Sequence, residues 1–239
     1  MTSRIAEVSP RQAAVVAGVG YLALFVLAIF ANFVVREGLI EPGDAAATAA
    51  NIVDSEGLFR AGLIAFRVVF VIDVPIAWAL YVFFKPVSQD VSLLTAWFRL
   101  VYTAFLGVAL VFFFMVLELL GGADHFAAFD AGQLDAQVML FLDAFNFTWL
   151  IGLAAFGLHL LMLGYLVLQS GATSRVLGYL LMLAGVAYIV DTVANGLLAD
   201  YDDYETLFLV MVAVPSVVGE MWLGLWLLFR GGRQQVASP

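Results

Sequence analysis

The sequence predicts an all-α integral membrane protein, built as a bundle of six transmembrane helices. Hydrophobic residues make up 64% of the 239 residues and charged residues only 12%, against about 45–50% and about 25% in ordinary soluble domains. A soluble fold of this size has too little interior to bury so much apolar surface, and the mean hydropathy of +1.03 agrees. We therefore expect a single polytopic membrane domain over residues 1–239, in contact with a lipid bilayer.

Six apolar stretches are each long enough to cross the hydrocarbon layer of about 30 Å, which takes about 20 helical residues. Backbone polar groups in lipid must be satisfied internally, and unbroken runs of this length satisfy them as helices. The first run is longer than the core of about 7–15 residues typical of a cleaved signal peptide, so we expect it to span the membrane. The predicted spans cover residues 13–35, 58–84, 92–120, 139–168, 176–198 and 207–229.

The connection between the first two spans predicts a short extra helix at the outer surface. Pro42 and Gly43 form a turn signal, and Asp44 directly after them is a good helix N-cap. The following stretch, Ala45–Asn51, is rich in alanine and has a strong helix propensity. We expect this helix to cover part of the outer end of the bundle.

The distribution of lysine and arginine predicts that both termini face the cytoplasm. These residues concentrate in the connections on one side of the membrane, and the opposite connections carry only Arg36. By the positive-inside rule the richer side is cytoplasmic, which places the protein in the cytoplasmic membrane of the cell. The residues of the richer side are Arg4, Arg11, Lys85, Arg175, Arg230 and Arg233.

Net charge and cysteine content exclude several classes of function. The formal net charge is −9, whereas a nucleic-acid-binding protein needs a basic face. The chain has no cysteine, which excludes a disulfide framework, thiol catalysis and thiolate metal sites.

Three sequence segments, spread over nearly the whole chain, carry a family resemblance. They are Glu41–Ile52 (EPGDAAATAANI) with Leu58–Arg60 (LFR), Phe156–Tyr165 (FGLHLLMLGY) and Leu183–Asp191 (LAGVAYIVD). In this order they resemble the prokaryotic membrane family catalogued as "domain of unknown function 4386". That family brings no established activity, so the resemblance implies the fold and no chemistry.

Ionisable and amide side chains inside the predicted spans mark the candidate site. An ionisable residue at bilayer depth costs roughly 2.5–3.5 kcal/mol, so we expect these side chains to face the bundle interior. A rise of about 1.5 Å per residue places Asp73 and Glu220 near the middle of the membrane. It places Arg99 and His159 in the cytoplasmic third and an outer layer around Arg67. Arg67 is expected either to pair with Asp143 or Asp191 or to contact an anionic group of the ligand. The candidate binding residues are Arg67, Asp73, Asp143, Asn146, Asp191, Asn195, Glu220 and His159.

The predicted spans hold more carboxylates than arginines. Five acids against three arginines leave a charge of −2 when every carboxylate is ionised. A low-dielectric interior does not hold uncompensated charges, so the site needs protonated carboxyls, a bound cation or a wet cavity. The acids are Asp73, Glu118, Asp143, Asp191 and Glu220, and the arginines are Arg60, Arg67 and Arg99, of which Glu118 and Arg60 lie near the outer edge.

Three functions stay open at this point. The first, which we favour, is binding or transport of a proton, a cation or a small solute, with Asp73 and Glu220 as carboxylate partners. The second is an intramembrane enzyme acting on a lipid or isoprenoid, with His159 in acid–base chemistry. It is favoured less, because the chain has no nucleophile elbow and no carboxylate-rich metal motif. The third is a structural or accessory subunit. Cofactors, a bound metal and a homo-oligomer are left undecided by the sequence.

Overall fold

The computed structural model describes residues 8–122, 126 and 128–233. Among these residues it has six helices that are long and apolar enough to cross a membrane. The predicted all-α fold with six spans is therefore confirmed, and the protein contacts the lipid bilayer. Arg4, which contributes to the predicted orientation, lies outside the described residues.

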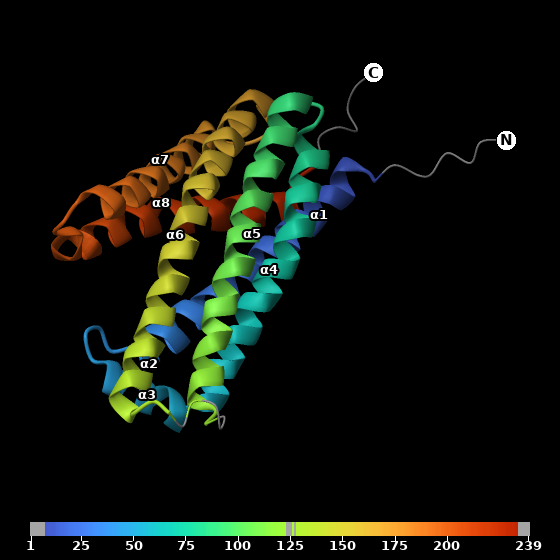
Figure 1. The fold of residues 1–239 in the computed structure, drawn as a ribbon. Helices are drawn as coiled ribbons and strands as arrows, with labels where there is room; N and C mark the ends of the chain where they lie inside the picture. Colours follow the sequence, from blue (N-terminus) through green and yellow to red (C-terminus); the bar gives the residue numbers. More distant parts are fainter. Residues whose placement is uncertain (1–7, 123–125, 127, 234–239) are drawn as a thin grey trace, which may run out of the picture. The chain divides into compact units, whose positions relative to one another are not determined.

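Each of the six long helices begins at or before the residue that the hydropathy pattern predicts, and Figure 1 follows them along the chain. In order, the elements are α1 (Pro10–Ile29), the π-helix η1 (Phe30–Arg36), α2 (Glu37–Leu39), α3 (Ala45–Asp54), α4 (Glu56–Phe84), α5 (Gln89–Leu120), α6 (Ala131–Ser170), α7 (Arg175–Leu197), the 3-10 helix η3 (Tyr201–Tyr204) and α8 (Glu205–Phe229).

The largest difference from the predicted spans is at the start of α6, which begins at Ala131 rather than at residue 139. The backbone N–H of Gln133 donates to the carboxylate of Asp130 at 2.8 Å, and the side chain of Gln133 accepts from the Asp130 N–H at 3.1 Å. This reciprocal capping box satisfies two backbone donors at the helix start. The helix therefore extends beyond the apolar run on which the prediction depends.

The short helix predicted between the first two spans is confirmed as α3. Gly43 adopts a φ of +79° in the turn before it, and the carboxylate of Asp44 accepts from the N–H of Ala47 at 2.9 Å. Thr48 ties the helix to the preceding chain, because its hydroxyl accepts from the Glu41 N–H at 2.9 Å. The turn and the N-cap therefore act as the sequence indicates.

The contacts divide the chain into two compact units. The first unit consists of Met1–Ala23, Ile72–Val101 and Leu153–Pro239, and the second of Leu24–Val71 and Tyr102–Gly152. Helices α4, α5 and α6 each contribute one segment to each unit. The two units are described separately below.

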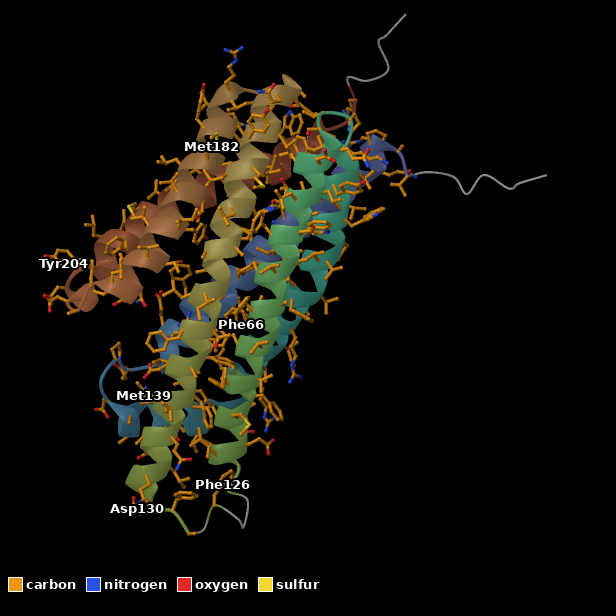
Figure 2. All side chains as sticks on the ribbon, turned by 45° about the horizontal axis from the view of Figure 1, so that its top comes forward. Phe66, Phe126, Asp130, Met139, Met182 and Tyr204 are labelled. Carbon is orange, nitrogen blue, oxygen red and sulfur yellow. The ribbon has the colours of Figure 1, made fainter. Side chains whose placement is uncertain are left out.

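Aromatic rings fill the core of the second unit. Phe59 stacks on Phe113 with ring centroids 4.4 Å apart. Phe66, labelled in Figure 2, meets Phe113 edge-on at 5.9 Å and Phe145 at 5.5 Å. All four phenylalanines are at most 2% exposed. Rings at these distances and angles attract one another beyond the effect of the area that they bury.

Close backbone contacts hold the helices of the first unit together. A Cβ atom added to Gly164 of α6 would lie 2.5 Å from the carbonyl oxygen of Gly178 of α7. One added to Gly157 would lie 2.7 Å from that of Gly185, seven residues further along α7. Only glycine permits this approach, which is a common way to pack helices in lipid. Helices α7 and α8 also lie side by side (Figure 1), and the turn between them carries Tyr204 (Figure 2).

Arg11 joins the start of α1 to the end of α8 within the same unit. Its guanidinium donates to the carbonyl oxygens of Leu228 at 2.7 Å and Gly231 at 2.9 Å. The last carbonyls of a helix have no partner within the helix, and a cation is favourable at that end of the helix dipole. The Arg11 side chain therefore caps the C-terminal end of α8 by donating to these carbonyl oxygens.

Candidate functional site

A buried ion pair between α4 and α5 is the centre of the candidate site in the first unit. Arg99 and Asp73 are both 0% exposed. The Nε and Nη2 atoms of Arg99 donate to Oδ1 of Asp73 at 3.0 and 2.6 Å. These are charge-assisted hydrogen bonds, the strongest kind that side chains make. The negative charge of Asp73 is therefore balanced by an arginine.

The opposite edge of the Arg99 guanidinium contacts α1 and α6. Its Nη1 donates to the hydroxyl of Tyr21 at 3.0 Å and lies 3.2 Å from Nε2 of His159. The other ring nitrogen of His159, Nδ1, lies 2.9 Å from the carbonyl oxygen of Thr95. A carbonyl only accepts, so Nδ1 carries the proton and Nε2 accepts from Arg99. His159 is therefore assigned as a neutral imidazole.

Two aromatic rings frame the guanidinium. The central carbon of Arg99 lies 5.0 Å from the ring centroid of Tyr21 and 5.4 Å from that of Phe156. Cations at this distance from a ring face are attracted by its quadrupole. Arg99 of α5 is thus held by charge, hydrogen bonds and aromatic contacts from three other helices, α1, α4 and α6.

The residues of this site lie at one depth along their helices. Each is nine to eleven residues from the helix end on the side of the membrane where α1 begins. At about 1.5 Å per residue, this is about 14–17 Å along the helix axis. We call this set the polar layer; it consists of Tyr21, Asp73, Arg99, His159 and Glu220.

Glu220 of α8 differs from the other members of the polar layer. It is partly buried and lies close enough to Arg99 and Asp73 for their charges to act on it. Within the part of the chain that the structure describes, its carboxylate makes no hydrogen bond and no ion pair. Glu220 is thus the carboxylate of the layer that has no ion pair or hydrogen bond of its own in the described part of the chain.

Three members of the layer, Asp73, His159 and Glu220, are among the predicted binding residues, whereas Tyr21 and Arg99 are not. Arg99 lies in the first third of α5, ten residues after the helix begins at Gln89, and contacts Asp73 there. Its position in the cytoplasmic third of the membrane stays a prediction.

A second polar cluster surrounds Arg36 in the second unit. Arg36 donates to the amide oxygen of Asn32 at 2.9 Å and to that of Asn146. Its guanidinium lies 5.2 Å from the ring centroid of Phe145 and 5.5 Å from that of Trp149. The predicted site residue Asn146 therefore does make a polar contact. Its partner is Arg36, which is predicted to lie in a connection between spans.

The π-helix η1 positions this second cluster. Its seven residues include both Asn32 and Arg36, and the Asn32 side chain donates to the carbonyl oxygen of Ala28 at 3.0 Å. π-helical turns are rare and occur often at functional sites. The sequence has no clear signal for a change from α-helical to π-helical hydrogen bonding at Phe30–Arg36. For this reason Arg36 is not among the predicted site residues.

The expected pairing of Arg67 with Asp143 is absent among the described residues. Both side chains are exposed, and Arg67 lies 5.8 Å from the ring centroid of Phe114. Arg67 shares its helix face with Ile64 and Val71, which are 59% and 61% exposed. The assumption that every ionisable residue in a span faces inward is wrong here. A long arginine side chain can reach polar surroundings from a lipid-facing position.

The predicted pair Asp191 and Asn195 lies near the end of α7 and shares one partner. The hydroxyl of Tyr201 donates to Oδ1 of Asp191 at 2.6 Å, and Asn195 also makes a hydrogen bond with Tyr201. Tyr201 stacks on Phe208 at 5.2 Å. Burial raises the pKa of the Tyr201 phenol above its ordinary value, and the hydrogen bond to Asp191 raises it further. Asp191 and Asn195 therefore lie on one face of α7, as predicted. They are near the C-terminal end of this helix, away from its N-cap Ser174.

Metal ligands do not gather in the described ranges. Among residues 8–122, 126 and 128–233, no group of three or more histidine, aspartate or glutamate side chains is placed to hold a metal ion. The polar layer instead offers one ion pair, one neutral imidazole, one phenol and one uncompensated carboxylate. Of these groups, the imidazole, the phenol and the carboxylate are of the types that exchange protons in proteins.

Comparison with known proteins identifies the family. A family model described as "domain of unknown function (DUF4386)" matches residues 16–231. The chain belongs to this family. The region that the DUF4386 model matches contains every residue of the polar layer, from Tyr21 to Glu220.

A similar protein is an archaeal one from Archaeoglobus fulgidus, named "Uncharacterized protein". It is 28% identical over 173 residues, which cover 72% of this chain and 85% of the relative. No solved structure matches the chain. The family resemblance that the sequence segments indicate is confirmed.

Proposed function

We propose that this multi-pass membrane protein binds and transfers a proton or a small cation at the polar layer, with Glu220 as the group that accepts it. The observation that carries the proposal is the carboxylate of Glu220. It lies within α8, nine residues before the end of that helix, and makes no hydrogen bond or ion pair among the described residues, while Arg99 forms its ion pair with Asp73.

The charge of the layer supports this role. With both carboxylates ionised, Asp73 and Arg99 cancel, His159 is neutral and Glu220 leaves a net charge of −1. An uncompensated charge at this depth costs roughly 2.5–3.5 kcal/mol or more. One proton or one monovalent cation removes this cost. Binding at Glu220 therefore needs no change in the Asp73–Arg99 pair.

The distribution of basic residues supports one orientation of the protein in the membrane. Arg11, Lys85, Arg175 and Arg230 lie at the helix ends from which the polar layer is about 14–17 Å deep. By the positive-inside rule we assign this side to the cytoplasm, and the prokaryotic family favours the cell membrane. In this orientation both termini are cytoplasmic.

Proton flux into proteoliposomes tests the proposal. The purified protein is reconstituted with a trapped pH-sensitive dye, and a potassium gradient with valinomycin sets the membrane potential. We expect the wild type to conduct protons and Glu220→Gln to reduce the flux to that of empty liposomes. The matched control is Glu118→Gln, because Glu118 is an exposed carboxylate of α5. Wild-type flux in Glu220→Gln would overturn the proposal.

A purely structural role for the polar layer is the second candidate. It is favoured by the hydrogen bonds of Arg99, which engage Asp73, Tyr21 and His159 together and fix four helices in register. In that case Asp73→Asn should destabilise the protein, and Glu220→Gln should change neither stability nor any flux. The two candidates therefore differ in the effect of Glu220→Gln on flux.

A further inference from the structure

A cavity of about 230 Å³ lies in the first unit, between the α6–α7 turn and the end of α8. It shares no residue with the polar layer, although Trp222 follows Glu220 by two residues along α8, so the proposal for it is separate from the proposed function. One wall is the turn residues Ala172, Thr173 and Ser174, and the other is Trp222 and Trp226 of α8 with Arg230, the residue directly after that helix.

The wall formed by α8 is a single face of that helix. Trp222, Trp226 and Arg230 follow one another at intervals of four residues, so their side chains are neighbours. Trp226 is held in place by an edge-on contact with Phe83 at 5.8 Å. Within the described chain, the Arg230 guanidinium makes no hydrogen bond or ion pair, and its side chain is exposed.

The cavity lies where the spans end. Helix α6 ends at Ser170, α7 begins at Arg175 and α8 ends at Phe229. At this level the hydrocarbon layer meets the lipid headgroups, where tryptophan is enriched because its ring is apolar and its N–H is polar. Arg175 and Arg233 add two more positive charges at the same helix ends.

We propose that this cavity binds the phosphate group of an anionic phospholipid. Arg230 supplies a planar, fixed-charge donor that suits phosphate oxygens, and Thr173 and Ser174 add hydroxyl donors. The indoles of Trp222 and Trp226 offer apolar surface to the glycerol and upper acyl chain. The surrounding positive charge favours an anionic lipid over a zwitterionic one.

Lipid retention tests the site. The full-length protein is reconstituted in nanodiscs of phosphatidylcholine with increasing phosphatidylglycerol, and the lipid that stays bound on release into the gas phase is measured by native mass spectrometry. We expect the wild type to retain phosphatidylglycerol selectively. Arg230→Gln should weaken this retention about tenfold, in line with the loss of a charge-assisted hydrogen bond.

The matched control is Arg233→Gln, because Arg233 carries the same charge close by but does not line the cavity. It should retain phosphatidylglycerol as the wild type does, and circular dichroism should give the same helix content for both variants. Equal retention by the two variants would overturn the proposal. Full displacement of the lipid by millimolar inorganic phosphate would also overturn it, since the site would then bind free phosphate.

Discussion

Two arginines, one in each unit, are held between aromatic rings but differ in the groups that accept their hydrogen bonds. Arg99 lies between Tyr21 and Phe156 and donates to the carboxylate of Asp73. Arg36 lies by Phe145 and Trp149, and its donors engage amide oxygens such as that of Asn146.

The comparison shows that similar aromatic surroundings can support different electrostatic roles. The carboxylate of Asp73 compensates the charge of Arg99 in a site without solvent exposure, whereas Arg36 is only partly buried and its amide acceptors are neutral. Loss of a charged partner in a closed site leaves an uncompensated charge, and loss of an amide leaves only a missing hydrogen bond. The two clusters should therefore respond very differently to substitution.

The largest effect is expected from Asp73→Asn, which leaves Arg99 charged and buried without its carboxylate. Breaking a buried ion pair by removing one partner costs about 3–5 kcal/mol. Unfolding in mixed micelles followed by circular dichroism measures the change. The control is Glu56→Gln, which breaks the exposed pair of Glu56 and Arg60 at 2.5 Å and should cost at most about 1 kcal/mol. Equal effects of the two variants would contradict the assignment of Arg99 and Asp73 as a buried pair.

A smaller effect is expected from Asn146→Ala in the cluster around Arg36. The variant removes one hydrogen bond from a charged donor, which is worth about 1.5–3 kcal/mol. The same unfolding measurement applies, with Phe147→Ala as control, because Phe147 is 59% exposed. A loss as large as that of Asp73→Asn would show that the two arginines are equally dependent on one partner.

Tyr201→Phe should destabilise the protein by about 1 kcal/mol, because it removes the neutral donor that binds Asp191. The raised pKa of Tyr201 also predicts a pH dependence. The folded state holds the phenol proton more tightly than the unfolded state, whose pKa is about 10. This stabilisation is complete below that pH and is lost as the pH rises above it. Unfolding midpoints from neutral pH to pH 11 should therefore fall more steeply in the wild type than in Tyr201→Phe.

The smallest effect on stability is expected from Glu220→Gln. The substitution removes a carboxylate that no described side chain neutralises, so it should change the unfolding free energy by less than about 1 kcal/mol, or increase it. Asp73→Asn, in the same layer, serves as the comparison. A destabilisation by Glu220→Gln as large as that of Asp73→Asn would mean that Glu220 is a structural partner of Arg99.

Much of the fold could be predicted because the information is local. An apolar run of about 20 residues identifies a span, and Gly43 with Asp44 identifies the start of α3. The sequence could not predict that Arg99 meets Asp73, since this contact joins residues 26 positions apart on two helices. Nor could it predict which face of α4 packs against the other helices, so that Asp73 is buried while Arg67 is exposed. Charge alone does not decide the direction in which a long side chain points.

The contact between Arg11 and the end of α8 has a consequence for biogenesis. Arg11 donates to Leu228, 217 residues later in the chain, and Gly18 lies against the backbone of the same residue. Helix α1 is therefore synthesised long before α8, and its packing is complete only after α8 has been inserted. Until then, the small-residue face of α1 that α8 later covers is open to other membrane helices or to an insertase.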